Sequence, residues 1–434
     1  MNIPEYCDVV VIGGGPAGSM VGTLLSQKGY DVVLLERQKH PRPHVGESLI
    51  PHFWKYCDMV QVSDKIAAEG FIQKAGGTVV WNEVIRQMRF KDFGYSRPAL
   101  HVERDRFDQI FSEHAKEQGV QVFEPVLASH VDLGQKTGVT YRLIGDKTEG
   151  KITCRFIVDA SGQNAVIAKQ LGIRVVDECF RFASLWGYFK NSKYVAFDGQ
   201  IHPNEDLSSI PPTTFVSSIK ETGDWGWSWH IPLRESTSVG LVLPVEFMKT
   251  VKAGGESWEA HFHRQCHNIP RLKDLLENAQ FCEGSFAAMQ DYSYRSTQIA
   301  GPGFFLIGDA AAFIDPIFSI GIVLSFYSAY LASWAIDRCL KNPNEVARYQ
   351  AMYTDQLVGR MEMVRSLALP RYQPGEPVDD LAKSTVQFES TVERELMDVV
   401  STMTTRSDNF HAIMADENVP KVTSKKFNVL EKIV

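Results

Sequence analysis

The N-terminal stretch Cys7–Glu36, CDVVVIGGGPAGSMVGTLLSQKGYDVVLLE, decides the fold. Its first residues, Cys7–Ile12, form a short apolar run of strand-forming residues, which is typical of a strand buried on both faces. The spacing G-x-G-x-x-G then places Gly13, Gly15 and Gly18 where this strand must turn into a helix. The first glycine permits the tight turn, the second lets the backbone approach a pyrophosphate, and the third lets helix and strand pack closely.

The remainder of this stretch completes a dinucleotide-binding unit. Ala17 and Gly18 lead into a helix predicted over Ser19–Lys28, whose N-terminal N–H groups and dipole favour a phosphate. Gly29 ends this helix, and residues 32–35 form the second strand. Glu36 closes that strand and is placed to accept hydrogen bonds from a ribose diol. The glycine spacing alone could be only a glycine-rich loop, but strand, helix, second strand and acidic residue within about thirty residues predict a dinucleotide site.

Composition narrows the class of protein. A chain of 434 residues is too long for one simple core, so we expect two or three lobes. The net charge of −7 argues against a nucleic-acid partner. Seven scattered cysteines form no disulfide framework, and with no recognisable signal peptide we expect a cytoplasmic protein. The charge-free run Ile317–Ile336 contains serines and tyrosines, so we interpret it as a buried helix and expect no membrane partner.

The order of predicted elements gives the fold class, an α/β protein. We expect a Rossmann-like FAD-binding domain, an inserted antiparallel β-sheet substrate domain and C-terminal helices. A helix is predicted over 49–66 and a buried strand over 152–158. Two further helices are predicted over 342–371 and 384–416, around a proline-rich break. The predicted boundaries are residues 1–70, 100–180 and 285–345 for the discontinuous FAD-binding domain, 71–99 and 181–284 for the β-rich substrate domain, and 346–434 for the C-terminal helical region.

The sequence has no second G-x-G-x-x-G that would hold a nicotinamide dinucleotide, so the one nucleotide site must hold the redox cofactor itself. A flavin fits that requirement better than NAD. Arg104 leaves a strand where a guanidinium could pair with flavin phosphate or ribityl oxygens, although a helix-surface arginine is the alternative. Asp309 follows a buried strand, so its carboxylate could accept ribityl hydroxyls, and the long helix follows it. Glu47 and Ser48 form a polar turn after Gly46, which we expect at the same level of the ligand crevice as Asp309.

Two further motifs make the chain resemble the flavin-dependent halogenases, which belong to the wider group of FAD-binding aromatic hydroxylase-like proteins. The segment Trp227–Pro232, WSWHIP, matches the family's W-x-W-x-I-P. Phe313, Pro316, Ser319 and Gly321 match its F-x-x-P-x-x-S-x-G. The resemblance covers roughly residues 5–370, and its phenol- or pyrrole-type branch fits best.

The resemblance implies roles for these motifs. Trp227, Trp229 and Pro232 would wall the flavin from the substrate, although an aromatic β-core is the alternative reading of that strand alone. Backbone amides at Ile320 and Gly321 would hold the halide beside the flavin. Ile320 departs from the family, where a small or hydroxylated residue is usual, so the pocket volume and halide preference are open. Further cofactor contacts implied by the resemblance are Arg37, Pro316 and Ile322.

The family's catalytic lysine matches Lys74 in FIQKAGG. It would hold hypohalous acid, by hydrogen bonding or as a haloamine, before the acid meets an aromatic ring. Burial would lower its pKa and make the amine accessible; the alternative is one of many exposed lysines. Tryptophan-type members pair this lysine with a glutamate that cannot be placed here, so a phenol or pyrrole is expected rather than an indole.

The resemblance also implies a two-component enzyme that receives FADH2 from a separate flavin reductase. It would use chloride or bromide on an aromatic substrate that is either free or tethered to a carrier protein. Three alternatives remain: a hydroxylase reduced directly by NAD(P)H, a reductase of isoprenoid double bonds, and a non-catalytic flavoprotein. His263, Cys266 and His267 have a spacing that zinc could use, but no fourth ligand is nearby, so we expect a helix face and no metal.

Overall fold

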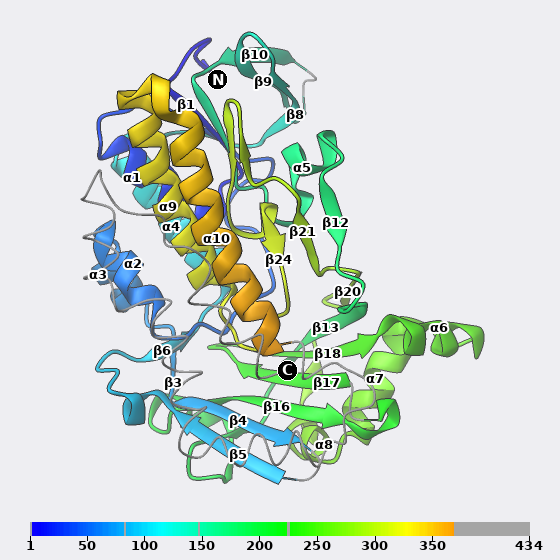
Figure 1. The fold of residues 1–434 in the computed structure, drawn as a ribbon. Coiled ribbons are helices and arrows are strands. Elements are labelled where there is room, and N and C mark those ends of the chain that lie inside the picture. Colours follow the sequence, from blue (N-terminus) through cyan, green and yellow to red (C-terminus); the bar gives the residue numbers. More distant parts are fainter. Residues whose placement is uncertain (1, 82–83, 146–147, 224–225, 369–434) are drawn as a thin grey trace.

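The computed structural model describes residues 2–81, 84–145, 148–223 and 226–368. The two largest sheets of these residues lie at opposite ends of the molecule in Figure 1, with the long helices packed beside the upper one. The predicted helix over 384–416, and the rest of the C-terminal region beyond residue 368, lie outside the described residues.

The upper sheet is the predicted nucleotide-binding sheet. Its strand order within the described chain is β22-β23-β11-β1-β2-β7, and every neighbouring pair but β22–β23 is parallel. Strands β1, β2 and β11 are buried along their whole length, as their continuous apolar runs predict. The bounds are Val9–Ile12 for β1, Val32–Leu35 for β2, Gln121–Phe123 for β7, Phe156–Asp159 for β11, Ala300–Gly301 for β22 and Phe304–Leu306 for β23.

Helices cover this sheet. Helix α1 (Pro16–Ser26) packs between α4 (Arg104–Glu117) and α9 (Gly321–Lys341), and α10 (Val346–Ala368) lies along α9. Helix α9 holds the charge-free run and is buried along most of its length. No helix in the described part of the chain is long and apolar enough to cross a bilayer.

The lower sheet has the order β19-β13-β18-β17-β16-β4-β5 in the described residues, with β20 also pairing with β13. It is antiparallel, as predicted, except for the one parallel pair β16–β4. The parallel pair arises because β4 and β5 come from the first hundred residues and insert at the sheet edge. The bounds are Gly76–Trp81 (β4), Val84–Arg89 (β5), Phe182–Lys190 (β13), Thr213–Ile219 (β16), Gly226–Pro232 (β17), Thr237–Pro244 (β18), Gln280–Phe281 (β19) and Ala287–Gln290 (β20).

Smaller elements connect the two sheets or cover them. Helices α6 (Val245–Ala253) and α7 (Trp258–Asn268) pack on the lower sheet, and α8 (Pro270–Leu276) packs against α7. Strand β3 pairs only with β6 at the level between the two sheets. The remaining bounds are Ile72–Lys74 (β3), Ala99–His101 (β6), Arg174–Val176 (β12), Tyr194–Val195 (β14), Ile201–His202 (β15), Tyr294–Ser296 (β21), Ala312–Phe313 (β24), Phe53–Met59 (α2), Ser63–Ala68 (α3) and Val166–Gln170 (α5).

Two local predictions differ from the structure. The segment expected as one strand over 152–158 is divided between β11 and β10 (Glu149–Thr153), which pairs with β9 (Thr137–Leu143) and β8 (Val126–Leu133) in a further antiparallel sheet. The segment 49–66, expected as one helix, contains α2 and α3 with a turn at Gln61, whose φ is +62°.

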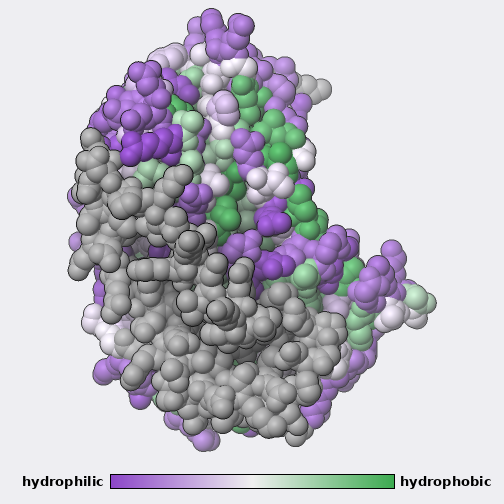
Figure 2. Space-filling view, viewed as in Figure 1, coloured by the Kyte–Doolittle hydropathy of each residue, from purple (hydrophilic) through white to green (hydrophobic). Residues whose placement is uncertain are grey.

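The visible surface of the described residues is mostly hydrophilic, and Figure 2 shows apolar residues gathered in a narrow band along one side of the upper half. The large hydrophobic side chains that are exposed, among them Tyr6, Ile144 and Leu171, are scattered along the sequence. Scattered single apolar residues are normal on a protein surface.

Candidate functional site

A cavity of about 750 Å³ lies where the two sheets face each other. The carboxyl ends of β1, β2, β11 and β23 open into it, which is where ligands bind in open α/β sheets. The lower sheet contributes the other wall through β13, β16 and β17. A volume of this size suits a cofactor or a drug-sized ligand.

The glycine loop between β1 and α1 is built around close backbone contacts. Gly13 has φ +107°, and a Cβ there would lie 2.4 Å from the Ala160 carbonyl oxygen. A Cβ on Gly18 would lie 1.9 Å from the carbonyl oxygen of Gly13, so the third glycine is needed for helix and loop to touch. A Cβ on Gly15 would meet nothing closer than Arg42 Nη2 at 3.4 Å, because that glycine faces the cavity.

Acidic and basic side chains flank this loop. Glu36 is buried, and its carboxylate accepts hydrogen bonds from the backbone N–H groups of Gly14 at 2.7 Å and Gln38 at 2.8 Å. Arg42 Nε lies 3.7 Å from Glu36 Oε1, and Arg42 Nη1 donates to Asp108 at 3.3 Å. The guanidinium of Arg42 therefore lies beside Gly15, at the point where an anion would meet the backbone.

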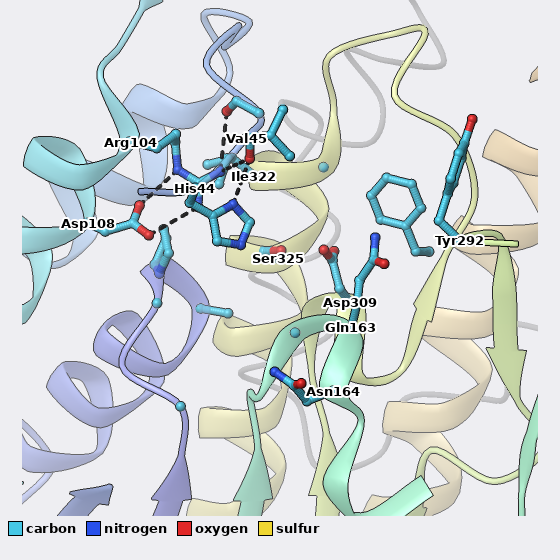
Figure 3. Close-up of a pocket in the computed structure, with 18 of the residues that line it drawn as sticks. His44, Val45, Arg104, Asp108, Gln163, Asn164, Tyr292, Asp309, Ile322 and Ser325 are labelled. Carbon is cyan, nitrogen blue, oxygen red and sulfur yellow. Dashed lines mark hydrogen bonds and ion pairs between the residues drawn. The ribbon is translucent and has the colours of Figure 1, made fainter. Parts of the chain in front are cut away.

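Arg104, predicted as a cofactor contact, also makes hydrogen bonds within the protein itself. Its guanidinium donates to both oxygens of Asp108, at 2.8 and 3.2 Å, and to the carbonyls of Val45 and Gly46 at 3.0 and 3.3 Å. Figure 3 shows this cluster with His44 on one side of the cavity. Arg104 thus ties the polar turn before Ser48 to helix α4, while it still lines the cavity.

Asp309 lies deeper in the same cavity, between this cluster and Tyr292 (Figure 3). Burial raises the pKa of its carboxyl to about 6, and the positive charge of Arg104 opposes that shift. The buried Tyr292 hydroxyl on the opposite wall has no hydrogen-bond partner within the described chain. Buried polar groups are normally paired, so this hydroxyl is available to a bound ligand.

Helix α9 does not follow Asp309 directly and begins only at Gly321, not at residue 317. The intervening loop is diverted by Asp315, whose carboxylate accepts from Ile317 N at 2.9 Å, and by Ser319, whose φ is +55°. Gly321 and Ile322 open the helix at the cavity wall, whereas the Ile320 side chain is buried outside the lining.

The aromatic strand β17 supplies one wall. Trp227 and Trp229 lie on the same face, with ring centroids 5.9 Å apart, and both line the cavity. Trp229 rests over Gly240, where any Cβ would overlap the indole at 2.1 Å, and its Nε1 donates to Ser238 Oγ at 3.2 Å. The indole is therefore fixed in place from behind.

Lys74 ends strand β3 and is only 4 % exposed. Its Nζ donates to Ser48 Oγ at 2.6 Å and to Thr214 Oγ1 at 3.1 Å, and both hydroxyls line the cavity. Ser319 in turn donates to Ser48 at 2.9 Å. Burial lowers the pKa of the amino group to about 7, and no carboxylate in the described chain pairs with it.

Comparisons with known proteins agree with this geometry. A family model described as an FAD-binding domain matches residues 6–351. A flavin-dependent halogenase of Armillaria mellea is 32% identical over 367 residues, which cover 81% of this chain and 68% of that relative. The chain belongs to the flavin-dependent halogenase family. The FAD-binding α/β architecture predicted from the sequence is thereby confirmed.

Other relatives extend the match. A tryptophan 2-halogenase of Chondromyces crocatus is 33% identical over 359 residues, covering 81% of this chain and 65% of that protein. The chain therefore spans slightly less than two thirds of the first curated relatives. The solved structure of the myxobacterial chondrochloren halogenase CndH is 30% identical, with a TM-score of 0.77 over 97% of this chain and 93% of that one.

Most residues that the sequence assigned to a halogenase site surround the cavity. Among the predicted cofactor-binding residues, Gly18 alone does not line the cavity, because it packs against the Gly13 carbonyl. Ile320, Pro232 and Lys74, which were predicted for other roles, also lie outside the lining. The predicted residues that line the cavity are Gly13, Gly15, Ala17, Glu36, Arg37, Glu47, Ser48, Arg104, Trp227, Trp229, Asp309, Pro316, Gly321 and Ile322.

Sequence reasoning missed several lining residues in this halogenase-family chain. Arg42 carried a signal, because the loop after Glu36 is basic and lacks acidic residues. The turn Ser161–Asn164 could also have been recognised, since it comes after the buried strand β11 just as Glu36 comes after the buried strand β2. Thr214 and Tyr292 had none, because only the tertiary fold brings them to the cavity.

The histidines considered for zinc lie on helix α7, away from the cavity. His267 Nδ1 donates to the carbonyl of His263 at 2.7 Å, and the His263 ring meets Phe281 edge to face. No group of three potential ligands occurs among the residues that the structure describes.

Proposed function

We propose that this chain halogenates an electron-rich aromatic ring, using FADH2, O2 and a chloride or bromide ion. One observation carries the proposal beyond family membership: a buried lysine contacts two hydroxyls of the cofactor cavity, and no carboxylate of the described residues lies beside it. A surface lysine would need neither burial nor those partners. An amine at this position can take up an electrophilic halogen.

The residues at the cavity fit FAD. The open face at Gly15 leaves room for a pyrophosphate, with Arg42 beside it and the start of α1 behind it. Glu36 lies at the end of β2, where its carboxylate could accept hydrogen bonds from a ribose. Deeper in the cavity, Asp309 and the Tyr292 hydroxyl, which has no partner among the described residues, offer further polar contacts. Bound FAD, once reduced, would supply the chemistry that converts O2 and halide into hypohalous acid.

The protein's own side chains then direct that oxidant. Backbone amides near Ile320 and Gly321, at the start of α9, would hold the halide. The fixed rings of Trp227 and Trp229 would keep the aromatic substrate out of the cofactor cavity. Lys74 would receive the halogen: its amine displaces hydroxide from hypohalous acid, water is released, and a nitrogen–halogen bond forms. An aromatic carbon then takes the halogen and gives up a proton, which restores the amine.

A phenol or pyrrole substrate, free or carrier-tethered, is our proposal for the ring. The absence of an acidic partner at Lys74 within the described residues supports it, since the family resemblance associates that partner with indole substrates. One relative is named a tryptophan 2-halogenase, so an indole belongs in any test. A separate flavin reductase would deliver FADH2.

The decisive experiment is a panel of phenols, pyrroles and indoles, free and carrier-bound, incubated with the full chain, a flavin reductase, NADH and FAD. Chloride and bromide are tested separately, and mass spectrometry reads the halogen isotope pattern. Organohalide from wild type but not from Lys74→Ala supports the proposal. Tight FAD binding with no product from any ring and no trapped hypohalous acid would contradict it.

A further inference from the structure

Lys74 is part of a buried hydrogen-bond network that ends at a main-chain carbonyl. From Lys74 the network runs through Ser48 and Thr214 to His101, which is 0 % exposed. The other ring nitrogen of His101, Nδ1, lies 3.0 Å from the Pro232 carbonyl oxygen. Pro232 is the last residue of the W-x-W-x-I-P motif, so this motif touches the network as well as the cavity.

The Pro232 carbonyl determines the direction of every bond in the network. A carbonyl oxygen only accepts, so His101 Nδ1 must carry a proton. Burial lowers the pKa of His101 well below its usual range, so the ring is neutral and Nε2 is an acceptor. Thr214 must therefore donate its single hydroxyl proton to Nε2, which lies 2.8 Å from Thr214 Oγ1.

The same reasoning continues toward the lysine. Because the proton of Thr214 is used, the 2.9 Å contact with Ser48 requires Ser48 to donate and Thr214 to accept. Ser48 has then used its own proton, so it accepts from Ser319 and from Lys74. Each of the two oxygens donates once and accepts twice, which is the full capacity of a hydroxyl group. No hydroxyl proton is left to point at the nitrogen of Lys74.

We infer, resting on the proposed function, that His101 is a positioning residue for Lys74. By orienting the hydroxyls of Thr214 and Ser48, His101 makes their oxygens the acceptors of both N–H bonds of the neutral amine. The nitrogen lone pair is then free to attack the halogen of hypohalous acid. In that step the nitrogen–halogen bond forms, the halogen–oxygen bond breaks, and the hydroxide leaves with the amine proton as water. An ammonium ion would bring a third N–H bond, which neither hydroxyl can accept. Among the described residues, the other contact of Lys74 Nζ is with the Phe90 ring, whose centroid lies 5.5 Å away.

The first test does not depend on measuring the activity of any variant. The full-length wild-type protein, labelled with [15N]histidine, is examined by NMR for the tautomer of His101, and the signal is assigned by its loss in His101→Phe. We expect protonation at Nδ1 and a pyridine-like Nε2 across pH 6 to 9. A His101 protonated at Nε2, or at both nitrogens, would overturn the inference whether or not the protein halogenates anything.

The second test uses variants with FAD content and melting temperature as folding controls. His101→Phe and Thr214→Val remove the acceptor or the hydroxyl, so organohalide formation should fall about tenfold or more, while hypohalous acid caught by a soluble 1,3-diketone is maintained. Thr214→Ser keeps the hydroxyl and should stay within about threefold of wild type. His114→Phe is the matched control, because it removes another buried imidazole, bonded to the Val60 carbonyl, that has no contact with Lys74.

The outcomes separate the two proposals. If wild type produces neither organohalide nor trapped oxidant, the proposed function fails, and the tautomer of His101 still reports on the network. If wild type halogenates and His101→Phe or Thr214→Val produces as much organohalide as His114→Phe, the positioning role is wrong and the halogenase proposal stands.

Discussion

At the scale of single residues, two buried ionisable groups of the site differ in how their charge is compensated. Asp108 is buried but receives two arginines, so its ionised form is stabilised and its pKa is held below the usual range, against the cost of burial. Lys74 is equally buried and receives only hydroxyls. Hydroxyl oxygens stabilise an ammonium ion far less than a carboxylate does, so burial shifts this lysine toward its amine form. This difference supports the proposal that Lys74, and not Asp108, is the reactive group.

The first prediction concerns Lys74→Ala. Organohalide formation should fall about a thousandfold, which corresponds to roughly 4 kcal/mol of transition-state stabilisation. FAD content and trapped hypohalous acid should persist, because the cavity lining is untouched. Lys74→Arg should not restore product, since a guanidinium stays protonated. Product near the wild-type level from Lys74→Ala would remove this residue from the mechanism while leaving the cofactor site in place.

A second prediction follows from the lowered pKa, about 7 in the folded protein against 10.5 for an unperturbed lysine. Between these values the unfolded chain binds more protons than the folded one, so wild type gains stability as pH rises from about 7 to 10, by up to ~1.4 kcal/mol per unit. Lys74→Met lacks this gain. Its stability relative to wild type should therefore be highest at pH 6 and decline toward pH 10. Urea unfolding of both proteins at several pH values measures the difference, and a difference that does not change with pH would show that Lys74 is not desolvated.

At the scale of elements, the predictable parts are those whose signal lies within one continuous stretch. The β1–α1–β2 unit is specified by Gly13, Gly15 and Gly18 together with two apolar runs, and the structure forms it where the sequence places it. Helix α9 was located, but its start was not, because an Asp315 side chain and a left-handed Ser319 redirect the chain before Gly321. The network of Ser48, Thr214 and His101 joins segments more than a hundred residues apart, so no local pattern could reveal it.

The third prediction separates two roles within the glycine loop. Gly15→Val should yield a folded but colourless protein, because its side chain enters only the cavity, beside Arg42. Gly18→Ala should instead destabilise the fold by about 2–4 kcal/mol, since its Cβ would overlap the Gly13 carbonyl. Gly134→Ala, where a Cβ meets nothing within 4 Å, is the control. Absorbance of bound flavin and thermal unfolding distinguish the two effects, and a yellow Gly15→Val protein would contradict the assignment of this loop.

At the scale of the whole molecule, function depends on how the two sheets meet. The nucleotide-binding sheet supplies backbone and charged groups from its carboxyl edge, and the lower sheet supplies Trp227, Trp229 and Thr214 from its inner face. Lys74 lies at the junction, on a strand that belongs to neither of these sheets and that, in the described part of the chain, pairs with β6 alone. Because its partners Ser48 and Thr214 line the cavity, Lys74 lies behind the hydroxyls of the cavity wall and not inside the cavity itself.

The last prediction tests where the electrons come from. The chain carries one G-x-G-x-x-G, at Gly13–Gly18, and the cavity beside it is accounted for by the contacts expected of FAD. No second dinucleotide motif offers a nicotinamide a pyrophosphate site, so NADH or NADPH alone should reduce the bound flavin very slowly. Adding a flavin reductase should restore turnover, as followed by flavin absorbance in a stopped-flow instrument. A hydroxylase that binds NADPH directly would instead bleach the flavin rapidly without a reductase. Fast bleaching of this kind, accompanied by a hydroxylated and unhalogenated ring, would replace the halogenase proposal with that one.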